Sequence, residues 1–338
     1  MIRYAVGRIG MLVGILFGVL TLTFVIERVL PGSPVEMMLG PKPTQEQIEL
    51  ARKALGLDRS MPEQFLIYLN DILHGDLGTS LLTSRPVTEE LATRLPATFE
   101  LVFLAMGLSI LIGLPLGVLS AVKQDSVIDH AARSSAIAGV ALPIFFTGMI
   151  LQMVFYGSLG ILPLQGRIGS EILLDHPFRH VTGFYLIDTL LAGNTTAFKS
   201  ALAHLVLPTA TITIASLATV TRIARGTMIE ALAEDHIRTL QAYGVAPRRI
   251  QYRYALKTAL VPMLTVIGLT FGLLLGGSVV VEYIFDWPGL GGFAVKAIIN
   301  NDFPAVIGVT MFLASSYLLV NLAVDLLYFA VDPRMSRS

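Results

Sequence analysis

Two histidines, His176 and His180, stand four residues apart in the stretch HPFRH, a spacing that can bind a metal ion when it lies on a helix. Pro177 argues against a continuous helix there, because proline has no amide donor. We therefore expect a loop pair and no metal site. The chain has no G-x-x-x-x-G-K-[ST] phosphate loop, no HExxH motif and no cysteine. These absences predict no enzymatic activity, no catalytic residue and no cofactor in this chain.

The composition is typical of a membrane protein. Of the 338 residues, 54% are hydrophobic and 14% are charged, whereas soluble domains carry about 25% charged residues. The net charge is zero, so no global field attracts nucleic acid. Six apolar stretches are long enough to span a bilayer, and we expect six transmembrane helices in an all-α membrane protein, because lipid leaves backbone amides no other partners. The stretches are residues 9–26, 97–122, 132–159, 201–221, 258–281 and 305–330.

The connecting loops differ in their content of lysine and arginine, which are enriched in cytoplasmic loops. These bases are frequent in residues 1–8, 123–133 and 222–257, whereas the loop 283–304 holds only Lys296. We therefore expect both termini in the cytoplasm. The first apolar stretch exceeds the ~7–15 residues of a signal-peptide core, so we expect it to be retained.

Residues 27–96 are predicted to form an extracytoplasmic helical loop region between spans 1 and 2 of a single transmembrane domain, residues 1–338. Thr44 can cap a helix that ends before Gly56. A second helix is expected to start after Pro62 and to run through FLIYLNDIL. No strand-like alternation stands out.

The segment 222–257 is charged and contains the stretch MIEALAEDHIRTLQAYGVAPRRI, residues 228–250. Glu234 lies four residues before Arg238, which predicts a stabilising pair on one helix. Gly244 is expected to end that helix, and Pro247 suits the first turn of the next one. Apolar residues at spacings of three to five predict one stripe along the first helix. They are Ile229, Leu232, Ile237, Leu240 and Tyr243, with Ala233 beside them.

The polar face of this predicted helix favours a protein partner over lipid. Glu230, Glu234 and Asp235 outnumber Arg238, so anionic lipid would repel this face. An apolar stripe with a mixed rim suits a groove on a partner protein. We therefore expect a partner to bind this helix by its stripe.

A series of motifs runs along nearly the whole chain. They are LPGSPV (30–35), KALGLD (53–58), GDLGTS (75–80), LPATFEL (95–101), GLPLGVLSA (113–121), GILPLQGR (160–167), HLVLPT (204–209), FDWPGLGG (285–292) and NLAVDLLYFAVDPR (321–334). With Glu230-Ala231 and the later Gly244, their order resembles permease subunits of ABC importers, in the oligopeptide, dipeptide and nickel branch, the first of its two paired permeases. Departures from the pattern of that branch occur at His236, at residues 240–244 and at Asn301.

The resemblance implies a type I ABC importer-like permease in the bacterial inner (plasma) membrane. It implies that a second permease completes the pore, that two ABC ATPases hydrolyse ATP with magnesium, and that an extracytoplasmic solute-binding protein delivers the cargo. The cargo would be di- or oligopeptides, with nickel and other small solutes left open. By this resemblance the ATPase-coupling loop includes Glu230, Ala231, Asp235, Arg238 and Gly244.

Glycines near the end of the fifth span, Gly276 and Gly277, are candidates for lining the pore. Such residues also permit close helix approach, so simple packing is the equal alternative. In the following loop WPGLGG, Trp287 and Gly289 are candidates for an outer gate.

Two other classes of function stay open. An ion-coupled transporter or a channel acting alone would keep ionisable groups near mid-membrane. The apolar stretches hold few such groups, among them Glu100, His204 and Asp325, and this scarcity disfavours ion coupling. A non-transporting membrane scaffold could use the segment 222–257 to recruit a cytoplasmic partner.

Overall fold

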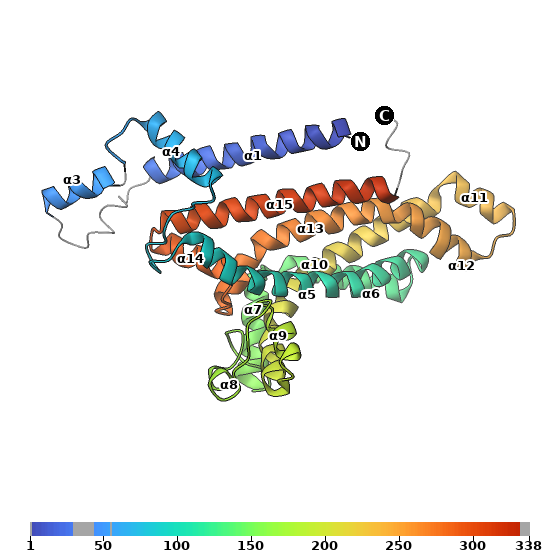
Figure 1. Cartoon of the computed structure of the whole chain (residues 1–338). Helices are drawn as coiled ribbons and strands as arrows, with labels where there is room; N and C mark the ends of the chain where they lie inside the picture. The colour runs from blue at the N-terminus through green and yellow to red at the C-terminus, as the bar shows by residue number, and fades with distance from the viewer. Residues whose placement is uncertain (1, 30–43, 55, 332–338) are drawn as a thin grey trace. The chain divides into compact units, whose positions relative to one another are not determined.

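The computed structural model describes residues 2–29, 44–54 and 56–331. Within these ranges the regular structure is helical, apart from one isolated bridge between Thr79 and Pro86 (Figure 1). The chain folds into two compact units. The first comprises residues 1–96 and 288–318, and the second comprises residues 97–287 and 319–338.

The first unit contains two clusters of packed helices. Phe65 of α4 (Met61–Leu73) lies edge-on against Phe24 of α1 (Ile2–Val29), with ring centroids 5.2 Å apart. A second cluster joins Val87 at the start of α5 (Val87–Val122) to α14 (Leu290–Ile299) and to the beginning of α15 (Phe303–Val331). Asp302 caps α15 and also accepts hydrogen bonds from the Ser80 hydroxyl and the Leu82 amide, so it ties the loop before α5 to this cluster.

The two helices predicted in the loop region 27–96 are present. The Thr44 hydroxyl accepts from the Gln47 amide, and the Gln47 side chain accepts from the Thr44 amide, so a reciprocal cap starts α3 (Gln45–Ala54). Gly56 follows with a φ of +64°. The predicted second helix is α4, and its first-turn residue Glu63 accepts from the Ser60 amide. The motif at residues 30–35 lies outside the described residues.

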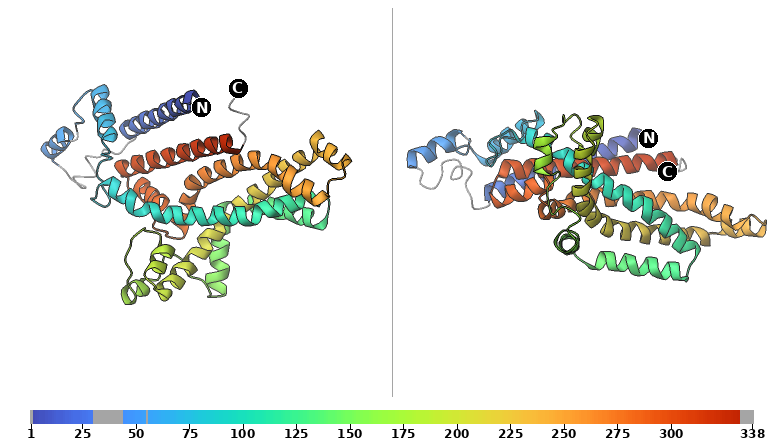
Figure 2. Two further views of the ribbon diagram at one scale, coloured as in Figure 1. Left: turned by 45° about the vertical axis from the view of Figure 1, so that its right-hand side comes forward. Right: turned by 90° about the horizontal axis from the view of Figure 1, so that it is seen from below.

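In the second unit α10 (Thr195–Ala233) is the central helix. It packs against α6 (Val127–Ala141), α7 (Ile144–Leu151), α9 (Tyr185–Leu191) and α13 (Leu256–Ile284). Figures 1 and 2 show α10 and α13 running side by side over much of their length. Of these helices, α10 and α13 lead into and out of the segment 222–257.

Gly117 of α5 lets α10 approach closely. A Cβ at this position would lie 2.6 Å from the Ala224 Cβ and 2.6 Å from the Thr221 carbonyl oxygen. Replacing Gly117 with alanine is expected to destabilise the fold by about 1–3 kcal/mol, the usual cost of overpacking. Thermal unfolding in detergent measures this loss.

Gly107, also within α5, is the matched control for that substitution. A Cβ there would have no neighbour within 4 Å. Because alanine favours helix over glycine by roughly 1 kcal/mol, Gly107→Ala should leave the unfolding temperature unchanged or raise it. Equal unfolding temperatures for the two variants would contradict the close approach of α5 and α10.

The predicted membrane class is confirmed, but the count of six spans is not. Four helices among the described residues are long and apolar enough to cross a bilayer, and one bent pair raises the number to five. The four are Val87–Val122, Thr195–Ala233, Pro247–Ile284 and Phe303–Val324. The first predicted span is helical as α1, but its apolar part, Gly10–Ile26, is shorter than the others.

The third predicted span, residues 132–159, is not one continuous helix. It comprises α6 and then α7, which continues as a π-helix, η1 (Gln152–Ser158), and the two parts meet at an angle of 99°. Pro143 stands at the break and offers no amide proton. Leu142 before it takes the extended conformation with ψ 133°, as residues before proline prefer. The proline therefore accounts for the broken span.

Candidate functional site

The segment 222–257 lies at the tip of α10 and α13, where α11 and α12 project in all three views (Figures 1 and 2). It contains the end of α10, then α11 (Asp235–Ala242), α12 (Pro247–Arg249) and a π-helix, η2 (Ile250–Ala255), that leads into α13. The predicted order of helix, turn and helix is therefore present. The second helix is continuous with the fifth span, since Pro247–Ile284 is helical throughout.

The first predicted helix is interrupted at Glu234. This residue has a ψ of 149°, so α10 ends at Ala233 and α11 begins at Asp235. The pair predicted between Glu234 and Arg238 does not form. Arg238 instead lies 3.4 Å from Asp235, and Glu234 lies 2.9 Å from the His236 ring nitrogen. These pairs are exposed, and such pairs contribute little to stability.

The apolar stripe of the segment packs inside the chain and not outward. Ile237 of α11 is fully buried, and Leu240, Ile229 and Leu232 pack around the same core. That core is made of buried residues from α5, α10, η2 and α13: Val118, Ala121, Ala224, Met228, Ala231, Ile237, Ile250, Ala255, Ala259 and Met263. The expectation that a partner binds this stripe is therefore wrong, because the chain's own helices cover it.

The outward surface of α11 is polar and carries one large aromatic residue. Asp235, His236, Arg238 and Gln241 are exposed, and Tyr243 is 79% exposed. The sequence places Tyr243 in the apolar stripe, but it lies at the C-cap of α11, where the helix ends, and its side chain is exposed. A partner that binds α11 would contact this mixed polar face and the tyrosine ring.

Gly244 closes α11 as the sequence predicts. Its φ is +73°, its amide bonds the Gln241 carbonyl at 2.9 Å, and the Val245 amide bonds the Leu240 carbonyl at 3.1 Å. This pair of bonds is the Schellman arrangement, in which a left-handed residue ends a helix. Pro247 then occupies the first turn of α12, as predicted. The turn is therefore fixed by backbone bonds and by a conformation that glycine adopts without strain.

The predicted coupling residues occupy two different environments. Glu230, Asp235 and Arg238 are exposed, and Gly244 is exposed in the turn. Ala231 is only 2% exposed and belongs to the core beneath α11. Four of the five residues can therefore contact a partner directly, whereas Ala231 supports the segment from within.

A buried carboxylate anchors α10 just before this segment. Asp129, at the start of α6, is fully buried and lies 2.6 Å and 2.8 Å from the Nε and Nη2 atoms of Arg225. It also accepts hydrogen bonds from the Ser120 hydroxyl and the Asp125 amide. This ion pair was not predicted, although the loop 123–133 holds two acids, Asp125 and Asp129, together with Lys123 and Arg133.

A second buried ion pair lies where α5 faces the loop before α8 (Ser170–Asp175). Glu100 accepts from the Nε and Nη2 atoms of Arg167 at 3.1 Å and 2.5 Å and from the Leu186 amide at 2.9 Å. The Arg167 guanidinium lies 3.8 Å above the Tyr185 ring and 5.7 Å from the Trp287 ring. The sequence analysis treated Glu100 as an isolated ionisable residue and missed this partner.

The candidate pore and gate residues differ in their exposure. Gly276 and Gly277 are exposed on α13, and a Cβ at either would meet nothing within 4 Å. The close helix contact in this span lies instead at Gly268, where an added Cβ would overlap the Val324 side chain of α15. Trp287 is buried and its indole N–H donates to the Ala97 carbonyl at 2.9 Å, and Gly289 is the N-cap of α14.

Comparison with known families identifies the chain. The family described as "binding-protein-dependent transport system inner membrane component" matches residues 113–337, and its N-terminal companion matches residues 1–102. This chain belongs to that family. It is therefore a membrane component of a binding-protein-dependent importer, as the sequence motifs indicated.

Three relatives of this permease match over nearly their full lengths. A probable D,D-dipeptide transport system permease from Escherichia coli K12 is 47% identical over 96% of this chain and 95% of its own. A di/tripeptide transport system permease from Pseudomonas aeruginosa is 41% identical over 99% of both chains. A glutathione transport system permease from Pectobacterium atrosepticum is 35% identical over 98% of both.

The histidine pair of the permease lies in a loop, as Pro177 predicts. α8 ends at Asp175, and His180 packs against the rings of Phe178 and Tyr185, with centroids 4.8 Å and 5.1 Å away. The His176 carbonyl accepts from the Asn194 side chain. Both histidines therefore take part in contacts that hold the loop together.

Buried Asp188 organises the same loop. Burial by itself raises the pKa of this carboxyl, but hydrogen bonds from the Thr182 hydroxyl and from the amides of Thr182, Gly183 and Val181 outweigh burial and hold the pKa below its ordinary value. Asp188 is therefore a structural anion of the permease that holds the loop against α9.

Proposed function

We propose that this permease takes up di- or oligopeptides in a binding-protein-dependent ABC importer. The observation that supports this cargo is the near-complete match to permeases named for dipeptide and di/tripeptide transport, at 47% and 41% identity. Nickel and other small solutes, which the sequence alone left open, are the alternative cargoes. Selectivity for a given peptide would reside in the binding protein that delivers it.

We further propose that the segment 222–257 couples this permease to ATP hydrolysis on partner chains. Two ABC ATPases would bind ATP and magnesium, and a second permease would complete the pore as a heterodimer. The exposed face of α11 and the ring of Tyr243 offer a surface to an ATPase. The buried stripe beneath them fixes α11 to α10 and α13, so force on α11 passes directly to two spans.

The proposed orientation places both termini and the segment 222–257 in the cytoplasm of a bacterium with the chain in its inner membrane. The distribution of lysine and arginine supports this orientation. The helical region 27–96 would then face the binding protein outside. Gly276 and Gly277 stay candidates for the pore wall, and Trp287 and Gly289 stay candidates for the outer gate.

Reconstitution in nanodiscs tests the proposal. The chain is assembled with its second permease and ATPases, and ATP hydrolysis is measured with the binding protein, with and without a dipeptide. Hydrolysis is expected to rise several-fold only in the complete assembly, and labelled dipeptide should accumulate in vesicles only with ATP. A binding protein loaded with nickel serves as the cargo control.

The rival functions predict different outcomes of the same experiment. Uptake by this chain alone in vesicles without ATP would establish an ion-coupled transporter or a channel. Binding of a cytoplasmic partner to α11 without any ATP hydrolysis would favour the scaffold. Either result would overturn the proposed function.

A further inference from the structure

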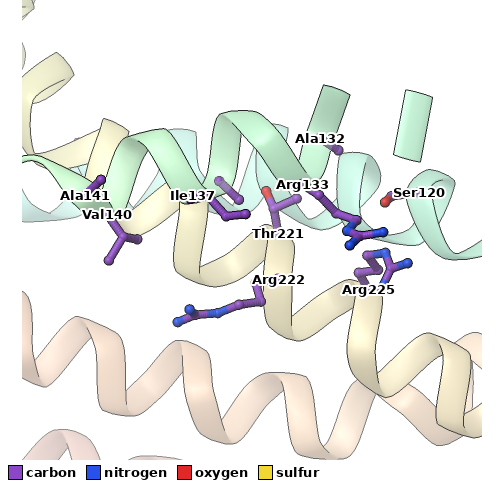
Figure 3. Close-up of a pocket in the computed structure, with 10 residues that line it drawn as sticks. Ser120, Ala132, Arg133, Ile137, Val140, Ala141, Thr221, Arg222 and Arg225 are labelled. Carbon is purple, nitrogen blue, oxygen red and sulfur yellow. The ribbon is translucent and has the colours of Figure 1, made fainter. Parts of the chain in front are cut away.

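A cavity of about 400 Å³ lies between α6 and α10 of the second unit. Its lining is partly polar and partly apolar (Figure 3). Arg133, Arg225 and Ser120 lie toward one end, and Val140 and Ala141 lie toward the other. The complete lining is Ser120, Ala132, Arg133, Ala136, Ile137, Val140, Ala141, Thr221, Arg222 and Arg225.

The lining carries a surplus of positive charge. It contains three arginines and no acidic residue. Asp129 neutralises Arg225, as described above. Arg133 and Arg222 form no ion pair or side-chain hydrogen bond with any residue that the structure describes. Figure 3 shows the guanidinium groups of Arg133 and Arg225 directed toward one another, while Arg222 extends away from them along α10. An anion beside Arg133 would balance the charge that is left unpaired at that end of the cavity.

The other end of the cavity suits hydrocarbon. Ala136, Ile137, Val140 and Ala141 line it with apolar atoms along about two turns of α6. Arginine binds phosphate through two parallel hydrogen bonds, and basic pockets between transmembrane helices bind phospholipid headgroups. Phospholipids, which surround a membrane protein, carry both hydrocarbon chains and a phosphate group.

We propose that this cavity binds one anionic phospholipid, with its phosphate between Arg133 and Arg225 and one acyl chain along Ile137 and Val140. The bound lipid bridges α6 to α10 next to the Asp129–Arg225 pair. This site is separate from the peptide cargo and from the surface of α11.

Native mass spectrometry of the full-length chain tests the site. The chain is titrated with palmitoyl-oleoyl phosphatidylglycerol and, in a second arm, with phosphatidylcholine of the same acyl chains. The first bound phosphatidylglycerol is expected to bind about tenfold more tightly than phosphatidylcholine. The double variant Arg133→Gln/Arg222→Gln should abolish this preference, whereas Arg238→Gln, which removes one exposed arginine elsewhere, should keep it.

A cavity-filling variant tests the hydrocarbon end without altering charge. Ala136→Leu should weaken phosphatidylglycerol binding several-fold and leave the fold intact. The lipid assignment is overturned if inorganic phosphate competes as well as the lipid, if a peptide carboxylate displaces it, or if adding the second permease excludes it. It is also overturned if the arginine double variant or Ala136→Leu binds phosphatidylglycerol as tightly as the unmodified chain.

Discussion

Replacing Gly244 with leucine is expected to lower peptide-stimulated ATP hydrolysis by the assembled importer at least tenfold while the chain still folds. Gly244 has a φ of +73°, and a Cβ there would meet no atom within 4 Å. The substitution therefore acts through the backbone, and the left-handed conformation costs a residue with a Cβ about 1–2 kcal/mol. Relaxation of this strain would shift Tyr243 and the end of α11, the surface proposed to contact the ATPase. Rates of ATP hydrolysis and of peptide uptake measure the effect.

Gly193 is the matched control for Gly244. It has a φ of +64° and also has no neighbour within 4 Å of a Cβ, but it lies in the turn before α10, far along the chain from α11. Gly193→Leu should lower stability similarly and leave coupling intact. Gly244→Asn should restore coupling, because asparagine tolerates the left-handed region. If Gly193→Leu abolishes ATP hydrolysis equally, the special role of the α11 turn is refuted.

Replacing Arg167 with methionine is expected to destabilise the chain by about 3–5 kcal/mol, because a buried charge would lose its partner. Glu100 is 4% exposed and would keep only the Leu186 amide as a hydrogen-bond donor among the contacts described above. Arg167 also covers the ring of Tyr185, so aromatic packing is lost as well. Thermal unfolding in detergent, followed by the fluorescence of the single tryptophan, Trp287, measures the change.

Two further variants separate the lost ion pair from a general effect of the substitution. Arg179 is exposed in the same loop, and Arg179→Met should change the unfolding temperature little. The double variant Glu100→Gln/Arg167→Met removes the unpaired charge and should recover more than half of the lost stability. If the double variant is less stable than Arg167→Met alone, burial of the Glu100 charge is not the cause.

Local signals in the sequence predicted local structure well. The caps at Thr44 and Gly244 and the helix start near Pro247 depend on residues within one or two turns, and all are present. Apolar length predicted the membrane class for the same reason, since each helix satisfies its own backbone. The sequence also shows Pro143, but the proline alone does not predict a bend of 99°, because the angle depends on the helices that pack beside it.

Local misses occurred at Glu234 and Tyr243, and the other misses concern contacts between residues far apart in the chain. Glu100 and Arg167 are separated by 67 positions, and Asp129 and Arg225 by 96. No periodicity within one segment indicates which acid meets which base. Ile237 and Leu240 of the predicted stripe do pack together, but whether the stripe faces the chain or a partner depends on the core contributed by α5, η2 and α13.

The burial of that stripe changes which substitutions report on partner binding. Ile237 and Ala231 belong to the core, so changing them tests folding. His236, Arg238, Gln241 and Tyr243 are exposed, so changing them tests contact with another chain. One of the family departures noted in the sequence, His236, lies on this outer face, so it would contact the ATPase under the proposed coupling.

The unbroken helix from Pro247 to Ile284 has a mechanical consequence. Its 38 residues form a shaft of about 57 Å at 1.5 Å per residue. The widened π turn at Ile250–Ala255 sits at one end of this shaft, next to α11. A push on α11 would therefore reach the fifth span through the turns of η2, and Pro262, which removes one backbone hydrogen bond of α13, marks a second point where this helix can bend.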